Sequence, residues 1–520
     1  MDMEKRPAQE VGKRSILQIV FGRTMIILVL LAVHFFLFFA LLMELTAYLP
    51  YWMGGVTVMT AVMLVYILNT RDNPSQKLSW CFLVAVAPVF GVMLYFFVKL
   101  DLGHRIYRKI DTRAAENSRS FVPDQAGILE SIRRREPELY GTAYYLDRYS
   151  GLGICPAEGC RYFPVGEEML EAMLSELEKA EKFIFLEYFI ISEGKMWNSI
   201  LEVLQRKAAQ GVEVRVMYDG TCSVFNLPYN YPKKLESMGI RCKLFSPLRP
   251  FISTHHNNRD HRKILVIDGK TAFTGGINLA DEYINHTHPY GHWKDTAVMV
   301  RGQAARSFTL LFLQMWNAME KEPVYTPYLT EFSSSGSAGG YVIPFSDTPT
   351  DKERVGQTVY MHMINQAREY IYIMTPYLIL DGETVTALCQ CAKRGVDIRI
   401  LQPEIPDHKY AHVLARRHYA ELMEAGVKLY AYTPGFVHAK VFLADGTSAV
   451  VGSINLDYRS LYLHYECGAY FYKAPVIKSI AEDFGETFAK SRLITDADLR
   501  KESLISRAAG IILKVVAPLM

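Results

Sequence analysis

Two histidine and lysine pairs have the residue types and the spacing of a site that handles phosphate. His261 is followed two residues later by Lys263, and His438 is followed in the same way by Lys440. Because side chains alternate faces along an extended chain, the two members of each pair point the same way. If both pairs converge on one pocket, two imidazoles and two fixed positive charges surround the ligand. This combination suits reactions at a phosphodiester.

The two pairs belong to an internal repeat. HRKILVIDGKTAFTGGINLADEY from His261 returns as HAKVFLADGTSAVVGSINLDYRS from His438, and GVEVRVMYD from Gly211 is answered by GVDIRILQP from Gly395. Short β-branched and aromatic runs alternate with helical patterns in both halves. We therefore predict two α/β units, related by a pseudo-twofold axis, that meet at the two pairs.

Two acidic residues at corresponding places in the repeat are the candidates for orienting the imidazoles. Asp295 stands in HWKDTAVMV and Glu466 in LHYECGAYF. A carboxylate on one ring nitrogen fixes the tautomer and leaves the other nitrogen free to attack or to donate a proton. The alternative is that both are ordinary acids on strands.

An asparagine follows each histidine at the same distance, and both have small neighbours. Asn278 lies in TGGIN with Gly276, and Asn455 lies in VGSIN with Ser453. Small residues let the backbone approach a ligand closely, so we expect these four residues to hold nonbridging phosphate oxygens. A turn-forming role is the alternative for the glycines.

Asp268 and Asp445 are expected to be structural. Each lies seven residues after its histidine, directly before Gly269 or Gly446. This odd offset aims the carboxylate away from the pocket along an unbroken strand. We expect both aspartates to hold a turn or a neighbouring backbone segment.

Three apolar runs lie before residue 100. Met25 to Leu49 has the length of a membrane span, Trp52 to Leu68 is of marginal length, and Trp80 to Val98 is interrupted by Pro88 and Gly91. A cleaved signal peptide is the alternative for the first run, but that run is too long and no small-residue cleavage site follows it.

Basic residues indicate the topology of these runs. They precede the first run and separate the second from the third, so both stretches are expected in the cytoplasm. Three full crossings would put the remainder outside, whereas the basic residues after the third run favour the inside. A third segment that re-enters at Pro88 and Gly91 without crossing resolves this conflict. We therefore favour a cytoplasmic catalytic part.

Composition excludes other classes of function. The eight cysteines have no zinc-ligand spacing, so we expect reduced, mostly buried thiols. We expect no cofactor. The formal net charge of +3 is too small, without a basic stripe, to indicate nucleic acid as a partner.

The motifs resemble those of a known family. HxKxxxxD followed by G-[GS]-x-N, present twice, is similar to the signature of the phospholipase D superfamily. NNRDHRKILVIDG from Asn257, GHWKDT from Gly291 and GSINLDYRS from Gly452 resemble the bacterial cardiolipin synthases. The N-terminal RDNPSQKLSW resembles that family's membrane segment, so the similarity spans nearly the whole chain.

The resemblance implies a phosphatidyltransferase of the bacterial plasma membrane. Such an enzyme joins two phosphatidylglycerols into cardiolipin and releases glycerol, without a metal. By the family's pattern, His261 is the nucleophile that forms a phosphohistidine and His438 is the acid. The expected partners are phosphatidylglycerol and other anionic lipids, and the oligomeric state stays open. The alternatives are a hydrolytic phospholipase D, a transferase with another donor or alcohol, and an inactive lipid-binding scaffold.

The predicted organisation follows from these segments. The boundary between the two α/β units is expected in the Ser/Gly-rich stretch 333–340, and the C-terminal helix is expected either on the membrane surface or docked on the protein. The predicted parts are a basic N-terminal segment 1–22, a membrane-embedded region 23–100, a juxtamembrane linker 101–149, a first unit 150–332, a second unit 333–495 and a C-terminal helix 496–520.

Overall fold

The computed structural model describes residues 23–44, 49–99, 102–222, 226–228, 230–246, 258–318, 320–330, 332 and 339–519. The expected basic segment 1–22 and most of the Ser/Gly-rich stretch lie outside these residues. The chain divides into a smaller unit, essentially residues 1–106, and a larger unit that holds almost all of residues 107–518. Each unit is described on its own.

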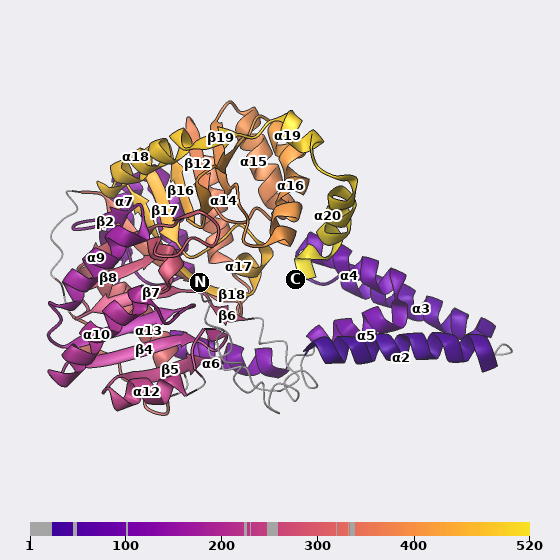
Figure 1. Ribbon diagram of the computed structural model, residues 1–520, viewed down its shortest axis with the longest axis horizontal. Helices are drawn as coiled ribbons and strands as arrows, with labels where there is room; N and C mark the ends of the chain where they lie inside the picture. The colour runs from indigo at the N-terminus through magenta and orange to yellow at the C-terminus, as the bar shows by residue number, and fades with distance from the viewer. Residues whose placement is uncertain are drawn as a thin grey trace, which may run out of the picture. The chain divides into compact units, whose positions relative to one another are not determined.

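The described residues of the smaller unit form four helices, drawn in indigo and violet in Figure 1. They are α2 (Arg23–Glu44), α3 (Leu49–Leu68), α4 (Pro74–Val86) and α5 (Pro88–Lys99). Among the described residues, one stretch, Tyr51–Leu68, is long and apolar enough to cross a membrane by length and composition. Shorter apolar stretches are Leu28–Leu37 and Pro88–Lys99.

The third apolar run is broken and turns back on itself. Helix α4 ends at Val86 and α5 begins at Pro88, whose ring cannot donate a backbone hydrogen bond. The helices approach so closely that a Cβ on Gly91 would lie 2.8 Å from the Cα of Val84. Lys99, at the end of α5, is 2.8 Å from Asp72, which precedes α4. Both ends of this hairpin therefore lie on the same side.

The larger unit contains two sheets with the same strand order. The first runs β2-β10-β8-β7-β3-β4-β5, and the second contains β11-β18-β17-β16-β12-β13-β14, extended by β1 beyond β11 and by β19 beyond β14. Each strand of the first sheet has its repeat partner at the same place in the second, which confirms the predicted pair of α/β units. The first-sheet strands are β2 (Arg161–Phe163), β3 (Phe183–Tyr188), β4 (Glu213–Asp219), β5 (Arg241–Phe245), β7 (Lys263–Ile267), β8 (Thr271–Gly275) and β10 (Ala297–Arg301). The second-sheet strands are β1 (Cys155–Pro156), β11 (Tyr341–Asp347), β12 (Tyr370–Met374), β13 (Asp397–Pro403), β14 (Lys428–Tyr432), β16 (Val441–Ala444), β17 (Ser448–Gly452), β18 (His464–Tyr472) and β19 (Ser491–Leu493).

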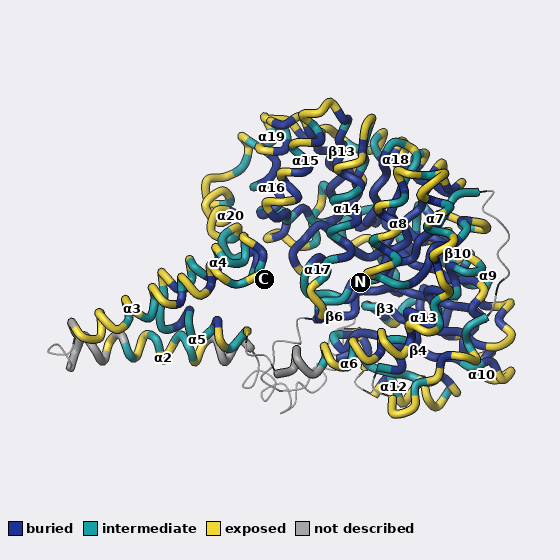
Figure 2. The backbone as a smooth tube through the Cα atoms, turned by 180° about the vertical axis from the view of Figure 1, so that it is seen from behind, coloured by how far each residue is buried: buried dark blue, intermediate teal, exposed yellow. Residues whose placement is uncertain are grey.

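Helices cover the sheets and a shared core joins them. Phe185 and Phe312 of the first half and Phe471 and Phe484 of the second belong to one buried apolar cluster, and Figure 2 shows the buried backbone running through both halves. The two halves therefore fold as one body. The helices are α9 (Gly166–Leu177), α10 (Lys195–Ala209), α12 (Tyr231–Ser237), α13 (Gln303–Asn317), α14 (Val355–Gln366), α15 (Gly382–Lys393), α16 (Lys409–Glu424), α17 (Tyr458–Tyr462), α18 (Val476–Ala489), α19 (Asp496–Arg500) and α20 (Leu504–Val516), with single 3-10 turns at η3 (Asp281–Ile284), η4 (Thr326–Tyr328) and η5 (Ala517–Leu519).

The segment 101–149, predicted as a juxtamembrane linker, is helical for most of its length. It forms α6 (Leu102–Arg119), α7 (Ala126–Arg135) and α8 (Pro137–Tyr149). Leu139, Ala143 and Leu146 of α8 are buried in the core of the second half. Their i, i+4, i+7 spacing is that of an amphipathic helix, and burial of this face fixes the segment on the domain.

Helix α20 docks on the protein and also leaves an apolar face uncovered. Gly510 is buried against α16, where a Cβ would lie 2.8 Å from Nε of Arg417. On the opposite side Leu504, Ile505 and Ile512 are 81%, 84% and 68% exposed. The docked arrangement is therefore present, and the position on a membrane surface stays a prediction.

Candidate active site

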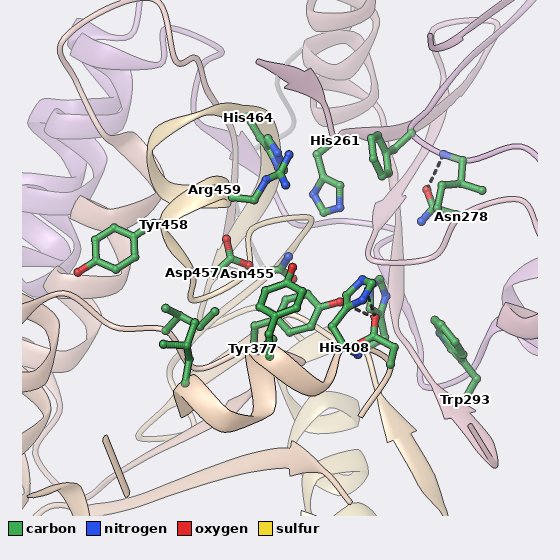
Figure 3. A pocket seen from close by; sticks show the side chains of 18 of the residues that line it. His261, Asn278, Trp293, Tyr377, His408, Asn455, Asp457, Tyr458, Arg459 and His464 are labelled. Atoms are coloured by element: carbon green, nitrogen blue, oxygen red, sulfur yellow. Dashed lines mark hydrogen bonds and ion pairs between the residues drawn. The ribbon is translucent and has the colours of Figure 1, made fainter. Parts of the chain in front are cut away.

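The two histidines line one cavity between the halves of the larger unit. His261 precedes β7 and His438 precedes β16, and both face a cavity of about 350 Å³. Figure 3 shows His261 pointing into this space among side chains from both halves. His261, Lys263, His438 and Lys440 are all buried. The repeat thus brings the four residues together, as the sequence predicted.

Each histidine contacts the carboxylate of the other half. Nδ1 of His261 is 2.9 Å from Oε1 of Glu466, and Nδ1 of His438 is 2.6 Å from Oδ2 of Asp295. An ionised carboxylate only accepts hydrogen bonds, so the contacted nitrogen carries the proton. The Nε2 atom of each ring is then left for chemistry.

Two short parallel strand pairs set this crossed arrangement. Strand β6 (Arg259–Asp260) pairs with the start of β18, and β15 (Gly435–Val437) pairs with β9 (His292–Lys294). The next residue of each strand is a histidine on one side and its carboxylate on the other. The backbone N–H of His261 donates to the carbonyl of Tyr465 at 3.0 Å, and that of His438 donates to the carbonyl of Lys294 at 2.7 Å. Backbone register therefore positions both side-chain pairs.

Burial keeps both imidazoles neutral. Desolvation lowers the pKa of His261 to about 3, against the opposing attraction of Glu466. Desolvation, with the charge of Lys440, lowers the pKa of His438 to about 4. Burial alone would raise the pKa of Glu466, but its contacts with His261 and His464 hold it well below its usual range. Glu466 is thus an ionised partner for a neutral ring.

The two lysines are buried beside the rings, and their surroundings differ. Lys263 donates to the carbonyl of His261 and Lys440 to that of His438. Nζ of Lys440 also lies 2.8 Å from Nδ1 and 3.1 Å from Nε2 of His438. Burial lowers the pKa of Lys263 to about 7 and that of Lys440 to about 8. Both ammonium groups therefore titrate near neutral pH before a ligand binds.

The two asparagines line the cavity and differ in their hydrogen bonds to the protein. The Asn278 side chain accepts from the N–H of Ile190 at 3.0 Å and donates to the hydroxyl of Tyr283 at 2.7 Å. Oδ1 of Asn455 has no hydrogen-bond partner among the described residues. Asn455 thus keeps its acceptor for a ligand, such as the hydroxyl of a substrate.

Gly276 and Ser453 differ from the sequence expectation. Their backbone N–H groups donate to the carbonyls of Thr296 and Cys467, so neither can donate to a phosphate. A Cβ on Gly276 would overlap Oδ1 of Asp295, and the hydroxyl of Ser453 donates to Glu466. Both residues therefore support the carboxylates behind the histidines.

Asp268 and Asp445 hold corresponding turns. Asp268 accepts from three consecutive backbone N–H groups, 181 to 183, at 2.8 to 2.9 Å. Asp445 accepts in the same way from 368 to 370. Both have a positive φ of 51°. These contacts support the structural role expected for both aspartates.

The cavity contains further side chains that the sequence analysis did not select. Trp293 and His464 face it from the positions two residues before Asp295 and Glu466. Alternation along a strand puts residues i and i+2 on one face, and this signal could have identified both. Among the described residues, His261, His464 and Glu466 form the one group whose ligand atoms, all within 4.8 Å, could hold a metal ion.

The remaining cavity wall is apolar at one end. Ile379, Leu414 and Ala517 line it there, and Ala517 directly follows α20. A cavity lined by imidazoles and by apolar side chains, with two lysines buried beside the imidazoles, fits an amphipathic phosphodiester.

Comparisons with known proteins show the family and the type of fold. A family model described as "Cardiolipin synthase, PLD-like domain" matches residues 173–316 and 360–488, and one described as "Phospholipase_D-nuclease N-terminal" matches residues 58–99. A cardiolipin synthase of Geobacillus kaustophilus is 33% identical over 90% of this chain and 93% of its own length. The "Cardiolipin synthase 2" of Bacillus cereus is 34% identical over 88% of this chain and 89% of its own.

Two further relatives extend this comparison. An uncharacterised protein of Streptococcus mutans is 48% identical over 88% of this chain and 99% of its own. The crystal structure of a phosphatidylserine synthase from Haemophilus influenzae aligns with a TM-score of 0.56 at 14% identity, covering 74% of this chain and 98% of that one. At this identity the likeness concerns the fold alone.

Proposed function

The chain belongs to the cardiolipin synthase family of phospholipase D-like enzymes, and from this we propose that it transfers a phosphatidyl group from one phosphatidylglycerol to another. The products are cardiolipin and glycerol. The observation that carries the proposal is the pair of buried histidines, each held by a carboxylate of the opposite half, in one cavity.

The first half of the reaction uses both rings. Nε2 of His261 attacks the phosphorus, and the bond from phosphorus to the glycerol oxygen breaks. That oxygen takes a proton from Nε2 of His438, so neutral glycerol leaves. The second half reverses the proton transfer: His438 removes the proton from the acceptor hydroxyl, which attacks phosphorus and releases His261.

The two lysine environments support this division of labour. Lys440 lies 3.1 Å from Nε2 of His438 and can supply the proton that this ring delivers. Lys263 donates a hydrogen bond to the backbone carbonyl of His261 and not to its ring. An anionic phosphate in the cavity favours the protonated form of His438 and of both lysines. Substrate binding thus favours the protonated imidazole that acts as the acid.

The N-terminal helices support a proposal for the membrane arrangement. Helices α4 and α5 have 13 and 12 residues, fewer than the ~20 that a span requires, and their outer ends are joined by the pair Asp72 and Lys99. We infer that this hairpin enters the bilayer and returns to the same face. A catalytic unit in the cytoplasm of a bacterial cell is consistent with this hairpin and the basic flanks.

Purified full-length protein in phosphatidylglycerol vesicles tests the proposed activity. We expect equimolar cardiolipin and glycerol, measured by mass spectrometry, and loss of both products with His261→Ala. Phosphatidic acid as the main product would instead identify a hydrolase, and no product from the wild type would contradict the proposal.

A further inference from the structure

The two halves furnish the cavity with different side chains at corresponding places. In the repeat, Glu282 aligns with Arg459 and Trp293 aligns with His464, and all four line the cavity. The first half thus contributes a carboxyl group and an indole where the second half contributes a guanidinium and an imidazole. A transfer between two chemically equal lipids still needs unequal positions for donor and acceptor, and this difference can provide them.

The surroundings of His438 are aromatic. The ring centroids of Tyr283 and Trp293 each lie 5.5 Å from that of His438, and the ring of Phe436 lies 5.7 Å away. Such walls suit the uncharged parts of a ligand.

The surroundings of His261 include a second imidazole, that of His464, whose nitrogens form no hydrogen bond with the described residues. The ring of His464 lies 5.4 Å from that of His261, and its side chain is 10% exposed. Neither of its ring nitrogens has a hydrogen-bond partner among the described residues; Oε1 of Glu466 is 3.7 Å from Nδ1. A buried polar group without a partner is costly, which indicates that a ligand group completes its hydrogen bonds.

Arg459 lies on the same side of the cavity. It is exposed, and no described carboxylate forms an ion pair with it within 4.0 Å. Figure 3 shows Arg459 beside His464, both next to His261. The neighbouring Asp457 is engaged by the N–H of Ser460 at 2.8 Å, where it begins α17. A planar guanidinium beside an imidazole is well suited to a phosphate.

The transferred phosphate does not require these groups. In the proposed reaction, the ammonium groups of Lys263 and Lys440 neutralise its single negative charge, and the leaving glycerol is neutral. A further cationic subsite therefore needs a further anion. In the proposed reaction, the acceptor lipid alone supplies a further anion. Its reacting hydroxyl is on the glycerol headgroup, and the other end of that glycerol carries the lipid's own phosphate.

We propose that Arg459 and His464 bind the phosphate of the acceptor lipid, so that the enzyme selects an anionic phospholipid over a neutral alcohol. This inference rests on the proposed phosphatidyl transfer. It makes both residues determinants of acceptor choice, because they bind the phosphate of the acceptor and not the phosphate that is transferred.

The test measures how the intermediate partitions between two acceptors in one reaction. Full-length protein receives phosphatidylglycerol vesicles and excess labelled glycerol, and we measure the ratio of cardiolipin to labelled phosphatidylglycerol. Because both products arise from one intermediate, incomplete folding lowers both but leaves the ratio unchanged. Arg459→Gln and His464→Asn should each lower the ratio about tenfold or more, as expected for the loss of a charge-assisted hydrogen bond. Arg368→Gln is the matched control, because this exposed arginine pairs with Glu138 on the surface.

The outcomes separate the two proposals. An unchanged ratio in both variants, with or without a fall in total turnover, overturns the acceptor subsite and leaves the transferase intact. A wild type that exchanges glycerol but forms no cardiolipin contradicts the proposed function itself. Labelled glycerol 3-phosphate as a third acceptor should lose reactivity in parallel with phosphatidylglycerol, because the recognised group is the phosphate and not the acyl chains.

Discussion

His261 lies 2.9 Å from Glu466, although the two residues are 205 positions apart and belong to different halves of the repeat. The reciprocal pair, His438 and Asp295, is separated by 143 positions. Each half therefore supplies one reacting imidazole and the carboxylate that orients the imidazole of the other.

This crossing predicts different defects for the two carboxylates. Glu466→Gln should impair attack by His261 and Asp295→Asn should impair proton transfer by His438, each lowering kcat by about two to four orders of magnitude. A phosphatidyl donor with a good leaving group should rescue Asp295→Asn only, because its departure needs no acid. Rescue of Glu466→Gln instead would reverse the assignment. Single-turnover kinetics with both donors provide the measurement.

The two histidine variants should differ in the same sense. With a donor that has a good leaving group, His438→Asn should accumulate a phosphorylated adduct on the peptide that contains His261, detectable by mass spectrometry. His261→Asn should form none. An adduct on His438 would exchange the two roles but keep the mechanism, whereas normal turnover in both variants would refute it.

The buried lysines predict the basic limb of the pH profile. The pKa values of Lys263 and Lys440 are lowered by burial to about 7 and about 8. As pH rises through these values, the free enzyme loses the positive charge that attracts the phosphate, so kcat/KM should fall. Bound phosphate favours the protonated lysines, so kcat should fall only at higher pH. Rates in detergent micelles from about pH 6 to about pH 10 test this; coincident limbs for both parameters would count against it.

Gly276 should tolerate no side chain. A Cβ there would overlap Oδ1 of Asp295, so Gly276→Ala should displace that carboxylate and resemble Asp295→Asn in kcat. Gly382→Ala is the matched control, because nothing lies within 4 Å of its Cβ position. Circular dichroism should show both variants folded. Wild-type activity in Gly276→Ala would mean that Asp295 need not hold its position.

Helix α20 should matter for lipid in bilayers but not for soluble substrate. Replacing Ile505 and Ile512 by serine removes two exposed apolar side chains without touching the face that docks on α16. We expect turnover of vesicle lipid to fall several-fold, at about 1 kcal/mol or more for each side chain withdrawn from the bilayer. Turnover of a short-chain monomeric substrate should stay unchanged, and an equal loss on both substrates would contradict membrane docking.

The repeat made most of the fold and the centre of the site predictable. Equivalent strands and the positions of Asp295 and Glu466 could be aligned between the halves because the motif spacing is nearly the same. The crossing could not be predicted, because it depends on pairings of two and three residues between β6 and β18 and between β15 and β9. Such short segments carry no periodic signal.

Other residues were missed for different physical reasons. Gly276 and Ser453 lie in the motif but contact Asp295 and Glu466 and not a ligand. The sequence of a loop does not show whether a given residue faces the ligand or another part of the protein. His464 and Trp293 were overlooked although the i, i+2 relation to the acids was available. The segment 101–149 was interpreted by its charges, and the apolar spacing of Leu139, Ala143 and Leu146 was not weighed.

The parallel pairing of β6 with β18 has a consequence for the order in which the chain acquires reactivity. During translation, all residues of the first half have been synthesised before β18 leaves the ribosome. Until then His261 has neither Glu466 on its ring nor the backbone partner at Tyr465, and Asp295 has no imidazole to orient. A nascent or truncated chain that ends before residue 466 can therefore carry an intact first motif beside the membrane without attacking its lipids.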